Sequence, residues 1–152
     1  PLFHFDGYTW GEKDPFVNGY YLTGDMVICH GDGSYSFSGR DDDIITTAGY
    51  RVGPADVEST LLEHDAVAES GVVAKPDEKR GSIIKAYVVI KAGQEPADDQ
   101  ELREELQELV RRRLSAHAYP REIEFVDELP KTPSGKIQRF MLRNRAQEEV
   151  TA

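Results

Sequence analysis

DDQELREELQELVRRRL, residues 98–114, contains the clearest secondary-structure signal in the chain. Its apolar residues recur every three or four positions and form the single stripe of an amphipathic helix: Leu102, Leu106, Leu109, Val110 and Leu114. Asp98 and Glu101 stand at the two positions of a capping box. Residues 111–113 are arginines in the last turn, where they complement the helix dipole. The stretch therefore predicts a surface helix whose arginines need no ligand to explain them.

The segments around this helix alternate between strand and helix patterns. Three β-prone runs are separated by turn residues: 67–74, 83–90 and 123–126. Pro54 begins a second helix, expected to reach His64. Three apolar residues should face inward from it: Val57, Leu61 and Leu62. The predicted fold class is α+β, a small domain with a central, roughly three-stranded sheet flanked by helices.

The first 38 residues differ in composition from the rest of the chain. Nine of the 14 aromatic residues lie there, which predicts that residues 1–38 are the edge of another lobe and that residues 39–152 form a separate domain. Within the first part, residues 30–34 (HGDGS) are turn-forming and lie between two β-prone runs. This pattern predicts a β-hairpin before the small domain.

Composition excludes several classes of protein. The chain has 18 basic and 28 acidic residues, a formal net charge of −10, which argues against a general nucleic-acid binder. No apolar run is long enough for a transmembrane helix, and residues 1–6 lack the pattern of a signal peptide. The only cysteine, Cys29, cannot form an internal disulfide, which fits a reducing compartment and a cytoplasmic location. The histidines lack metal-ligand spacing, so no metal site is expected.

Two polar segments lie near the expected boundary. Asp25 follows a β-prone run and a glycine, where a carboxylate can accept hydrogen bonds from vicinal ribose hydroxyls; Gly-Asp is also ordinary turn chemistry. Arg40 precedes three consecutive acidic residues, 41–43. These lack the alternating ligands and the glycine of a calcium loop. The arginine and its acidic neighbours are also typical of a solvated turn with local charge pairing.

Two loops further along the chain contain residues that are suited to binding a ligand. AGYRVGP, residues 48–54, leads into a helix, and its glycines permit close approach of a ligand while Arg51 can hold a phosphate. LPKTPSGKI, residues 129–137, is stiffened by two prolines and presents Lys136. Residues 131–145 contain five basic and no acidic residues. That local inversion indicates either an anionic ligand or a solvated basic tail.

Taken in order, these segments resemble the C-terminal part of an adenylate-forming enzyme, the superfamily of acyl-CoA synthetases, luciferases and peptide-synthetase adenylation domains. YLTGD at 21–25 is similar to the family's ribose-binding motif, and GRDDD at 39–43 to its interdomain hinge motif. PKTPSGK at 130–136 is similar to its lysine-bearing loop. GYRVGP at 49–54 is most similar to the acetyl- and medium-chain acyl-CoA synthetase branch.

The resemblance implies a ligase with two steps. A carboxylic acid would react with ATP to give an acyl-adenylate and pyrophosphate, and CoA would then form the thioester and release AMP. Lys136 would be the catalytic residue of the first step, bridging the carboxylate and the α-phosphate. Mg²⁺ is expected in such an enzyme, but its ligands and the carboxylate pocket would belong to a large N-terminal domain, which the resemblance implies is not part of this chain.

The remaining roles follow from the same motifs. Asp25 would bind the ribose of ATP or AMP, and Arg40 would lie close to the ribose and phosphate. Asp42 would be the hinge pivot. Gly49 would lie along the path of pantetheine after rotation, and Arg51 would meet a phosphate in that second state.

Under this resemblance, residues 1–38 are the C-terminal edge of the large domain and residues 39–152 are the swinging lid. The fragment should be inactive alone, with exposed aromatic residues, disorder or a self-association contact in residues 1–18. Two alternatives stay open. One is a stand-alone module with the lid fold that binds a nucleotide, CoA or a protein. The other is a lid that serves a carrier-protein pantetheine instead of free CoA.

Overall fold

The computed structural model describes residues 16–96 and 98–151. The chain separates into two compact units, and the boundary between them falls between Asp42 and Asp43. The aromatic surface expected in residues 1–18 concerns mainly residues 1–15, which lie outside the described residues.

The first unit contains two antiparallel hairpins. Strand β1 (Phe16–Val17) pairs with β2 (Tyr20–Tyr21), and β3 (Asp25–Cys29) pairs with β4 (Tyr35–Arg40). The predicted hairpin with its turn at residues 30–34 is confirmed. Its register sets Asp25 opposite Arg40, so the open end of this hairpin brings a carboxylate beside a guanidinium. A short 3-10 turn, η1 (Asp41–Asp43), follows.

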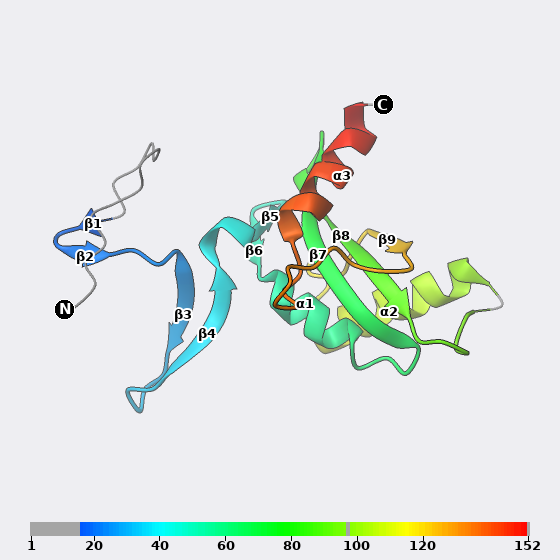
Figure 1. The fold of residues 1–152 in the computed structure, drawn as a ribbon, viewed down its shortest axis with the longest axis horizontal. Helices are drawn as coiled ribbons and strands as arrows, with labels where there is room; N and C mark the ends of the chain where they lie inside the picture. The colour runs from blue at the N-terminus through cyan, green and yellow to red at the C-terminus, as the bar shows by residue number, and fades with distance from the viewer. Residues whose placement is uncertain (1–15, 97, 152) are drawn as a thin grey trace. The chain divides into compact units, whose positions relative to one another are not determined.

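The second unit has a three-stranded sheet flanked by helices, as the sequence predicts (Figure 1). Its elements, in chain order, are β5 (Ile45–Thr47), β6 (Tyr50–Val52), α1 (Pro54–Leu61), β7 (Val67–Asp77), β8 (Gly81–Ile90), α2 (Asp99–Arg113), β9 (Glu122–Phe125) and α3 (Arg139–Thr151). Strand β8 pairs antiparallel with β7 and parallel with β9. A parallel pair needs a long crossover connection, and α2 lies in that connection.

The sheet has a hydrophobic core on each face. Neighbouring residues of a strand point to opposite faces, so Val72 packs toward one core and Val73 toward the other. The larger core joins the sheet to α1 and α2, and includes Val57, Leu61, Leu106 and Val110. The smaller core joins it to α3, and its members are Val73, Tyr87, Leu129, Leu142 and Ala146. Each fully buried aliphatic side chain contributes about 1.5–3 kcal/mol.

Both predicted helices end earlier than their apolar patterns indicate. Helix α1 ends at Leu61, so Leu62 is the C-cap and its side chain is exposed instead of facing inward. Helix α2 ends at Arg113, and Leu114 likewise becomes an exposed C-cap residue. The inner stripe of α2 is therefore shorter than predicted. At its start, the Asp98 side chain accepts a hydrogen bond from the Gln100 amide at 2.7 Å, as an N-cap should.

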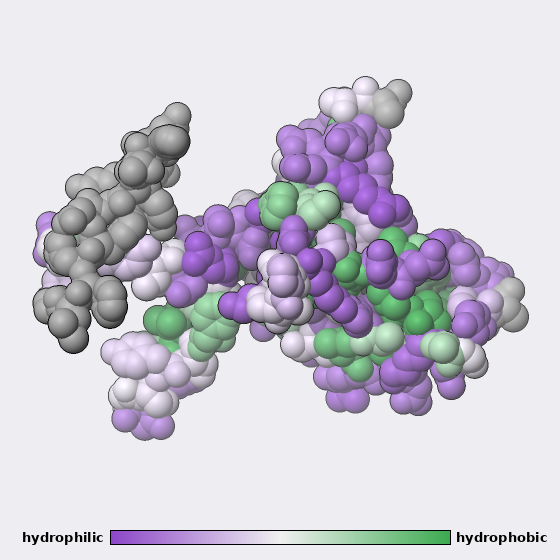
Figure 2. Space-filling model, in the orientation of Figure 1, coloured by the Kyte–Doolittle hydropathy of each residue, from purple (hydrophilic) through white to green (hydrophobic). Residues whose placement is uncertain are grey.

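Helix α3 has no counterpart in the sequence-based prediction, which treats residues 131–145 only as a basic stretch. Only Leu142 and Ala146 are buried on it, and Figure 2 shows hydrophilic residues over most of its surface. So thin an apolar face gives a weak periodic signal. The spacing of Leu142 and Ala146, one turn apart, is the pattern that indicates the helix.

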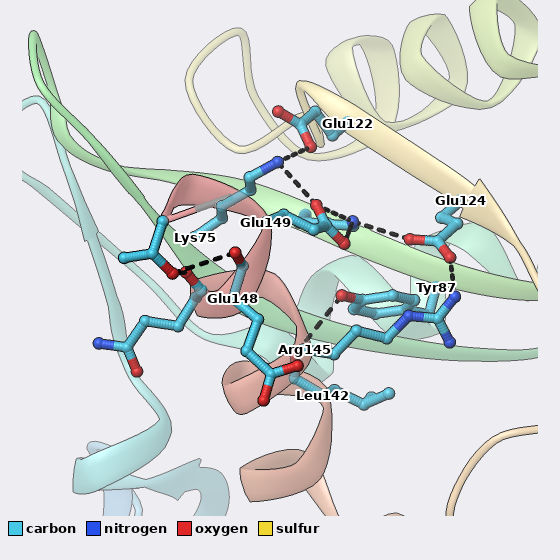
Figure 3. Close-up of polar contacts among 11 residues, drawn as sticks. Lys75, Tyr87, Glu122, Glu124, Leu142, Arg145, Glu148 and Glu149 are labelled. Carbon is cyan, nitrogen blue, oxygen red and sulfur yellow. Dashed lines mark hydrogen bonds and ion pairs between the residues drawn. The ribbon is translucent and has the colours of Figure 1, made fainter.

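Ionic contacts attach the C-terminal part of α3 to the sheet (Figure 3). Lys85, only 3% exposed, contacts Glu124 at 2.8 Å and Glu149 at 2.5 Å. Lys75 contacts Glu122 at 2.7 Å and Glu149 at 2.8 Å. Burial alone would lower the pKa of Lys85, but hydrogen bonds to Glu124 and Glu149 outweigh it and raise the pKa. Glu149 thus holds two lysines of neighbouring strands to one helix.

Candidate functional site

The open end of the β3–β4 hairpin gathers three of the predicted site residues. The Arg40 guanidinium donates to the Thr23 carbonyl at 2.8 Å and contacts Asp25 Oδ1 at 3.3 Å. Its Nε contacts Asp42 Oδ1, also at 3.3 Å. The Asp41 amide donates to the Gly24 carbonyl at 2.9 Å, closing the end of the ladder. Strand register and the 3-10 turn that follows β4 therefore place Asp25, Arg40 and Asp42 in one cluster.

This cluster is exposed to solvent and holds both signs of charge. The carboxylates of Asp42 and then Asp25 raise the pKa of the Arg40 guanidinium. Both acidic side chains keep considerable exposure. A carboxylate and a guanidinium side by side can accept from hydroxyls and donate to a phosphate. That chemistry suits a nucleotide, and the same contacts also serve as local charge pairing.

Gly49 lies at the tip of the β5–β6 hairpin. The two turn residues, Ala48 and Gly49, both have left-handed backbone conformations, with φ of 48° and 86°. Two-residue hairpins of this type favour glycine, so the turn accounts for Gly49 without a ligand. A Cβ atom at this position would also meet no atom within 4 Å. The space beside Gly49 is therefore open.

Arg51 follows on β6 beside a shallow hollow. This hollow, about 140 Å³, is also lined by Asp56 of α1 and by His117. The His117 ring stacks on Tyr50 with centroids 3.9 Å apart. Gly49 and Arg51 therefore belong to one small structural element, which is attached to the core by buried Ile45 and Val52.

Lys136 is presented by a closed loop between β9 and α3. The Thr132 amide donates to the Lys136 carbonyl at 2.8 Å, and the Lys136 amide donates back to Thr132 Oγ1 at 3.1 Å. Lys131 and Ile137 form an isolated bridge at the base. Lys131 also contacts Glu69 at 2.6 Å, which attaches the loop to β7. These contacts hold the backbone of the loop in place, while Lys136 itself is exposed to solvent.

The basic residues of 131–145 are mostly neutralised by acids from distant parts of the chain. Arg139 and Arg143 contact Asp43, and Arg139 also contacts Glu58. Arg145 pairs with Glu124. Among the residues that the structure describes, only Lys136 of these five basic residues has no carboxylate partner. Acidic partners therefore account for most of the positive charge of this stretch, and the charge without an acidic partner is that of Lys136.

The described residues contain neither a candidate membrane span nor a candidate metal site. None of their helices is long and apolar enough to cross a membrane. Within residues 16–96 and 98–151, no three histidine, cysteine or acidic side chains are grouped as a metal site would require.

Comparison with known proteins adds independent information. A family model described as "AMP-binding enzyme C-terminal domain" matches residues 56–136. The chain is 50% identical to a 4-hydroxybutyrate–CoA ligase of Metallosphaera sedula over 98% of its length, and 53% identical to an acetyl-coenzyme A synthetase of Bacillus subtilis over 82%. A crystal structure of an acyl-CoA synthetase from Brucella canis matches 99% of the chain with 55% identity and a TM-score of 0.68. The chain spans only 26%, 22% and 27% of these three proteins.

Proposed function

Because the chain belongs to the AMP-binding enzyme C-terminal domain family, we propose that it works as the lid of an ATP-dependent acyl-CoA synthetase. The resemblance seen in the sequence motifs is confirmed. The complete enzyme would convert a carboxylic acid and ATP into an acyl-adenylate and pyrophosphate, then transfer the acyl group to CoA and release AMP. The names of the matched relatives, an acid–CoA ligase and an acetyl-CoA synthetase, support this reaction class.

One observation carries the proposal: Lys136 is an exposed cation on a closed loop, and its basic neighbours are neutralised. A lysine is a compact point charge that suits negative charge developing at phosphorus. Lys136 would contact the reacting carboxylate and the α-phosphate in the first step. Its backbone hydrogen bonds to Thr132 would keep the loop in place while the side chain reaches the anion.

The first unit would contribute to nucleotide binding. Asp25 would accept hydrogen bonds from the ribose hydroxyls, and Arg40 would lie near the ribose and phosphate. Their contact at 3.3 Å supports a shared role. Asp42 would be the pivot, and the boundary of the two compact units directly after it supports this role. Residues 1–38 would then be the edge of the large domain.

The β5–β6 hairpin would serve the second step. Pantetheine would pass Gly49, where the open space beside the glycine supports a path for the thiol-bearing arm. Arg51 would meet a phosphate of the same substrate. Carrier-protein pantetheine presents the same arm, so an assay that supplies CoA and a carrier protein separately distinguishes the two acceptors. We assign no Mg²⁺ ligand to this chain and expect those ligands in the large domain.

Two properties of the chain itself follow as predictions. The 152-residue chain should form no acyl-adenylate from ATP and a carboxylic acid, and detection of that product would contradict the lid assignment in favour of a self-sufficient enzyme. A cytoplasmic location is expected from the single cysteine, although a mouse acyl-coenzyme A synthetase that is 45% identical over 83% of the chain is named as mitochondrial. Fractionation of cells that express the complete protein would test the location.

The decisive experiment replaces Lys136 with alanine in the complete synthetase and assays the two steps separately. ATP–pyrophosphate exchange should fall by about 10²–10³-fold, the usual loss when one transition-state contact is removed. Thioester formation from pre-made acyl-adenylate should persist. Lys91→Ala is the matched control, since Lys91 is an exposed lysine outside the site. Unchanged exchange in Lys136→Ala would contradict the proposal.

A further inference from the structure

The second unit contains a cluster of four charged side chains that connects its first residue to the start of α3. We call it the hinge-exit cluster; its members are Asp43, Glu58, Arg139 and Arg143. Asp43 is the first residue of the second unit, directly after the proposed pivot Asp42. Its carboxylate, 12% exposed, contacts Arg143 Nη1 at 2.5 Å and Arg139 Nη1 at 3.4 Å. Asp43, which we call the hinge exit because it follows the proposed pivot, is therefore attached to α3 by two arginines.

Arg139 is itself held in a fixed orientation. Its Nε and Nη2 donate to the two carboxylate oxygens of Glu58 at 3.1 and 2.6 Å. Glu58 is buried on α1, and its Oε1 also accepts from the Val72 amide of β7 at 2.9 Å. A two-pronged arginine–carboxylate contact sets direction as well as distance. The guanidinium is thus locked between helix α1 and the hinge exit.

This locked residue lies next to the lysine loop. Arg139 is the first residue of α3 and follows Lys136 by three positions. The intervening backbone is short and hydrogen-bonded, with the Gln138 amide donating to the Pro130 carbonyl at 2.8 Å. The Gly49 hairpin is attached elsewhere, through buried Ile45 and Val52 of the larger core and through the Ala48 amide, which donates to the Arg80 carbonyl at 3.2 Å. Leu129 and Ile137, at the base of the Lys136 loop, pack in the smaller core, so the two proposed reaction elements are anchored to different parts of the second unit.

We propose that Arg139 is a positioning residue for the adenylation step, holding the Lys136 loop at a fixed place relative to the hinge exit. This inference rests on the proposed function. Rotation at Asp42 would move Asp43, and the hinge-exit cluster would transmit that movement to the base of the lysine loop. Placement errors of about 1 Å can lower a rate about 10²-fold. The thioester step, which uses the Gly49 hairpin, would not depend on Arg139.

The test uses the complete synthetase with Arg139→Met, which keeps an unbranched apolar stem and removes the guanidinium. ATP–pyrophosphate exchange should fall by about 10²-fold. The loss should appear in kcat, with KM for ATP little changed, because Asp25 and Arg40 are untouched. Thioester formation from pre-made acyl-adenylate should stay within about threefold of wild type. The exchange rate of Arg139→Lys should lie between those of Arg139→Met and wild type, because lysine keeps the positive charge but cannot make the two-pronged contact with Glu58.

Arg145→Met is the matched control, because Arg145 lies on the same helix and pairs with Glu124 outside the hinge-exit cluster. Both half-reactions of this control should stay within about threefold of wild type. The positioning role is overturned if Arg139→Met lowers both steps equally, if it lowers neither, or if Arg145→Met has the same effect. If Arg139→Met fails to fold, the same comparison is made with Arg139→Lys. A lower exchange rate with normal thioester formation supports the positioning role, and equal losses in both rates overturn it.

The same assays separate this inference from the proposed function. A wild-type enzyme without ATP–pyrophosphate exchange, or a Lys136→Ala enzyme with normal exchange, contradicts the proposed function. If both behave as expected while Arg139→Met reduces the two half-reactions to the same extent, only the positioning role fails.

Discussion

Replacing Glu149 with glutamine removes a carboxylate that two lysines share and leaves the shape of the side chain nearly unchanged. The lysine side chains are largely buried, 13% exposed for Lys75 and 4% for Lys85. Removal of one partner from an isolated buried ion pair costs about 3–5 kcal/mol. Here each lysine keeps a second carboxylate, Glu122 at 2.7 Å and Glu124 at 2.8 Å. We therefore expect the smaller cost of a lost charged hydrogen bond, about 1.5–3 kcal/mol.

The assay is urea unfolding of the 152-residue chain, followed by far-ultraviolet circular dichroism. For a domain of about a hundred residues, 1 kcal/mol corresponds to about 4 °C in Tm. Glu149→Gln should therefore also lower Tm by about 6–12 °C. Glu148→Gln is the matched control, since Glu148 is the exposed neighbour on the same helix. It should change the free energy of unfolding by less than about 0.5 kcal/mol.

The pH dependence gives a second, independent test. Burial alone would raise the pKa of Glu149, but hydrogen bonds from Lys75 and Lys85 outweigh it, so the folded-state pKa lies below the ordinary value of 4.5. A depressed carboxyl pKa contributes stability that is complete above the unfolded pKa and is lost as pH falls through the folded pKa. The difference in free energy of unfolding between wild type and Glu149→Gln should be largest near neutral pH and should decrease only below pH 4.5. A variant as stable as the Glu148→Gln control near neutral pH, or a difference that persists unchanged in strong acid, would refute the reasoning.

Three other substitutions test the packing that positions the site. Leu106→Ala removes a fully buried side chain of α2 and should cost about 2–5 kcal/mol in urea unfolding. Gly71→Ala would set a Cβ 2.7 Å from Leu142 Cδ1, so it should cost about 1–3 kcal/mol and speed amide hydrogen exchange in α3. Gly49→Ala should lower Tm through about 1–2 kcal/mol of left-handed strain, whereas Ala48→Gly, in the same turn, should raise it. The packing argument fails if Leu106→Ala costs less than about 1 kcal/mol, or if hydrogen exchange in α3 is unchanged in Gly71→Ala. The same sign of Tm change for both turn variants would contradict the assignment of the turn.

Several features could be predicted from the sequence because they depend on neighbours within a few positions. The helix over residues 99–113 shows its apolar period, its Asp98 cap and its terminal arginines within one stretch. The hairpin around residues 30–34 follows from turn residues between two β-prone runs. The order of the four motifs along the chain indicated the family, which the family model then matched. Lys136 could be singled out in the same way, as a lysine on a loop stiffened by proline.

Tertiary structure alone decided how the charges of the molecule are arranged. Arg143 meets Asp43 across 100 positions of sequence, and Lys85 meets Glu149 across 64. Such contacts exist only after the helices pack on the sheet, so no local pattern contains them. Helix α3 was missed for the same reason, because it is held by Leu142, Ala146 and ionic contacts to distant strands more than by a periodic face of its own. The exposure of Lys136 without a partner is thus a property of the packed fold, since distant acids neutralise every other basic residue in its stretch.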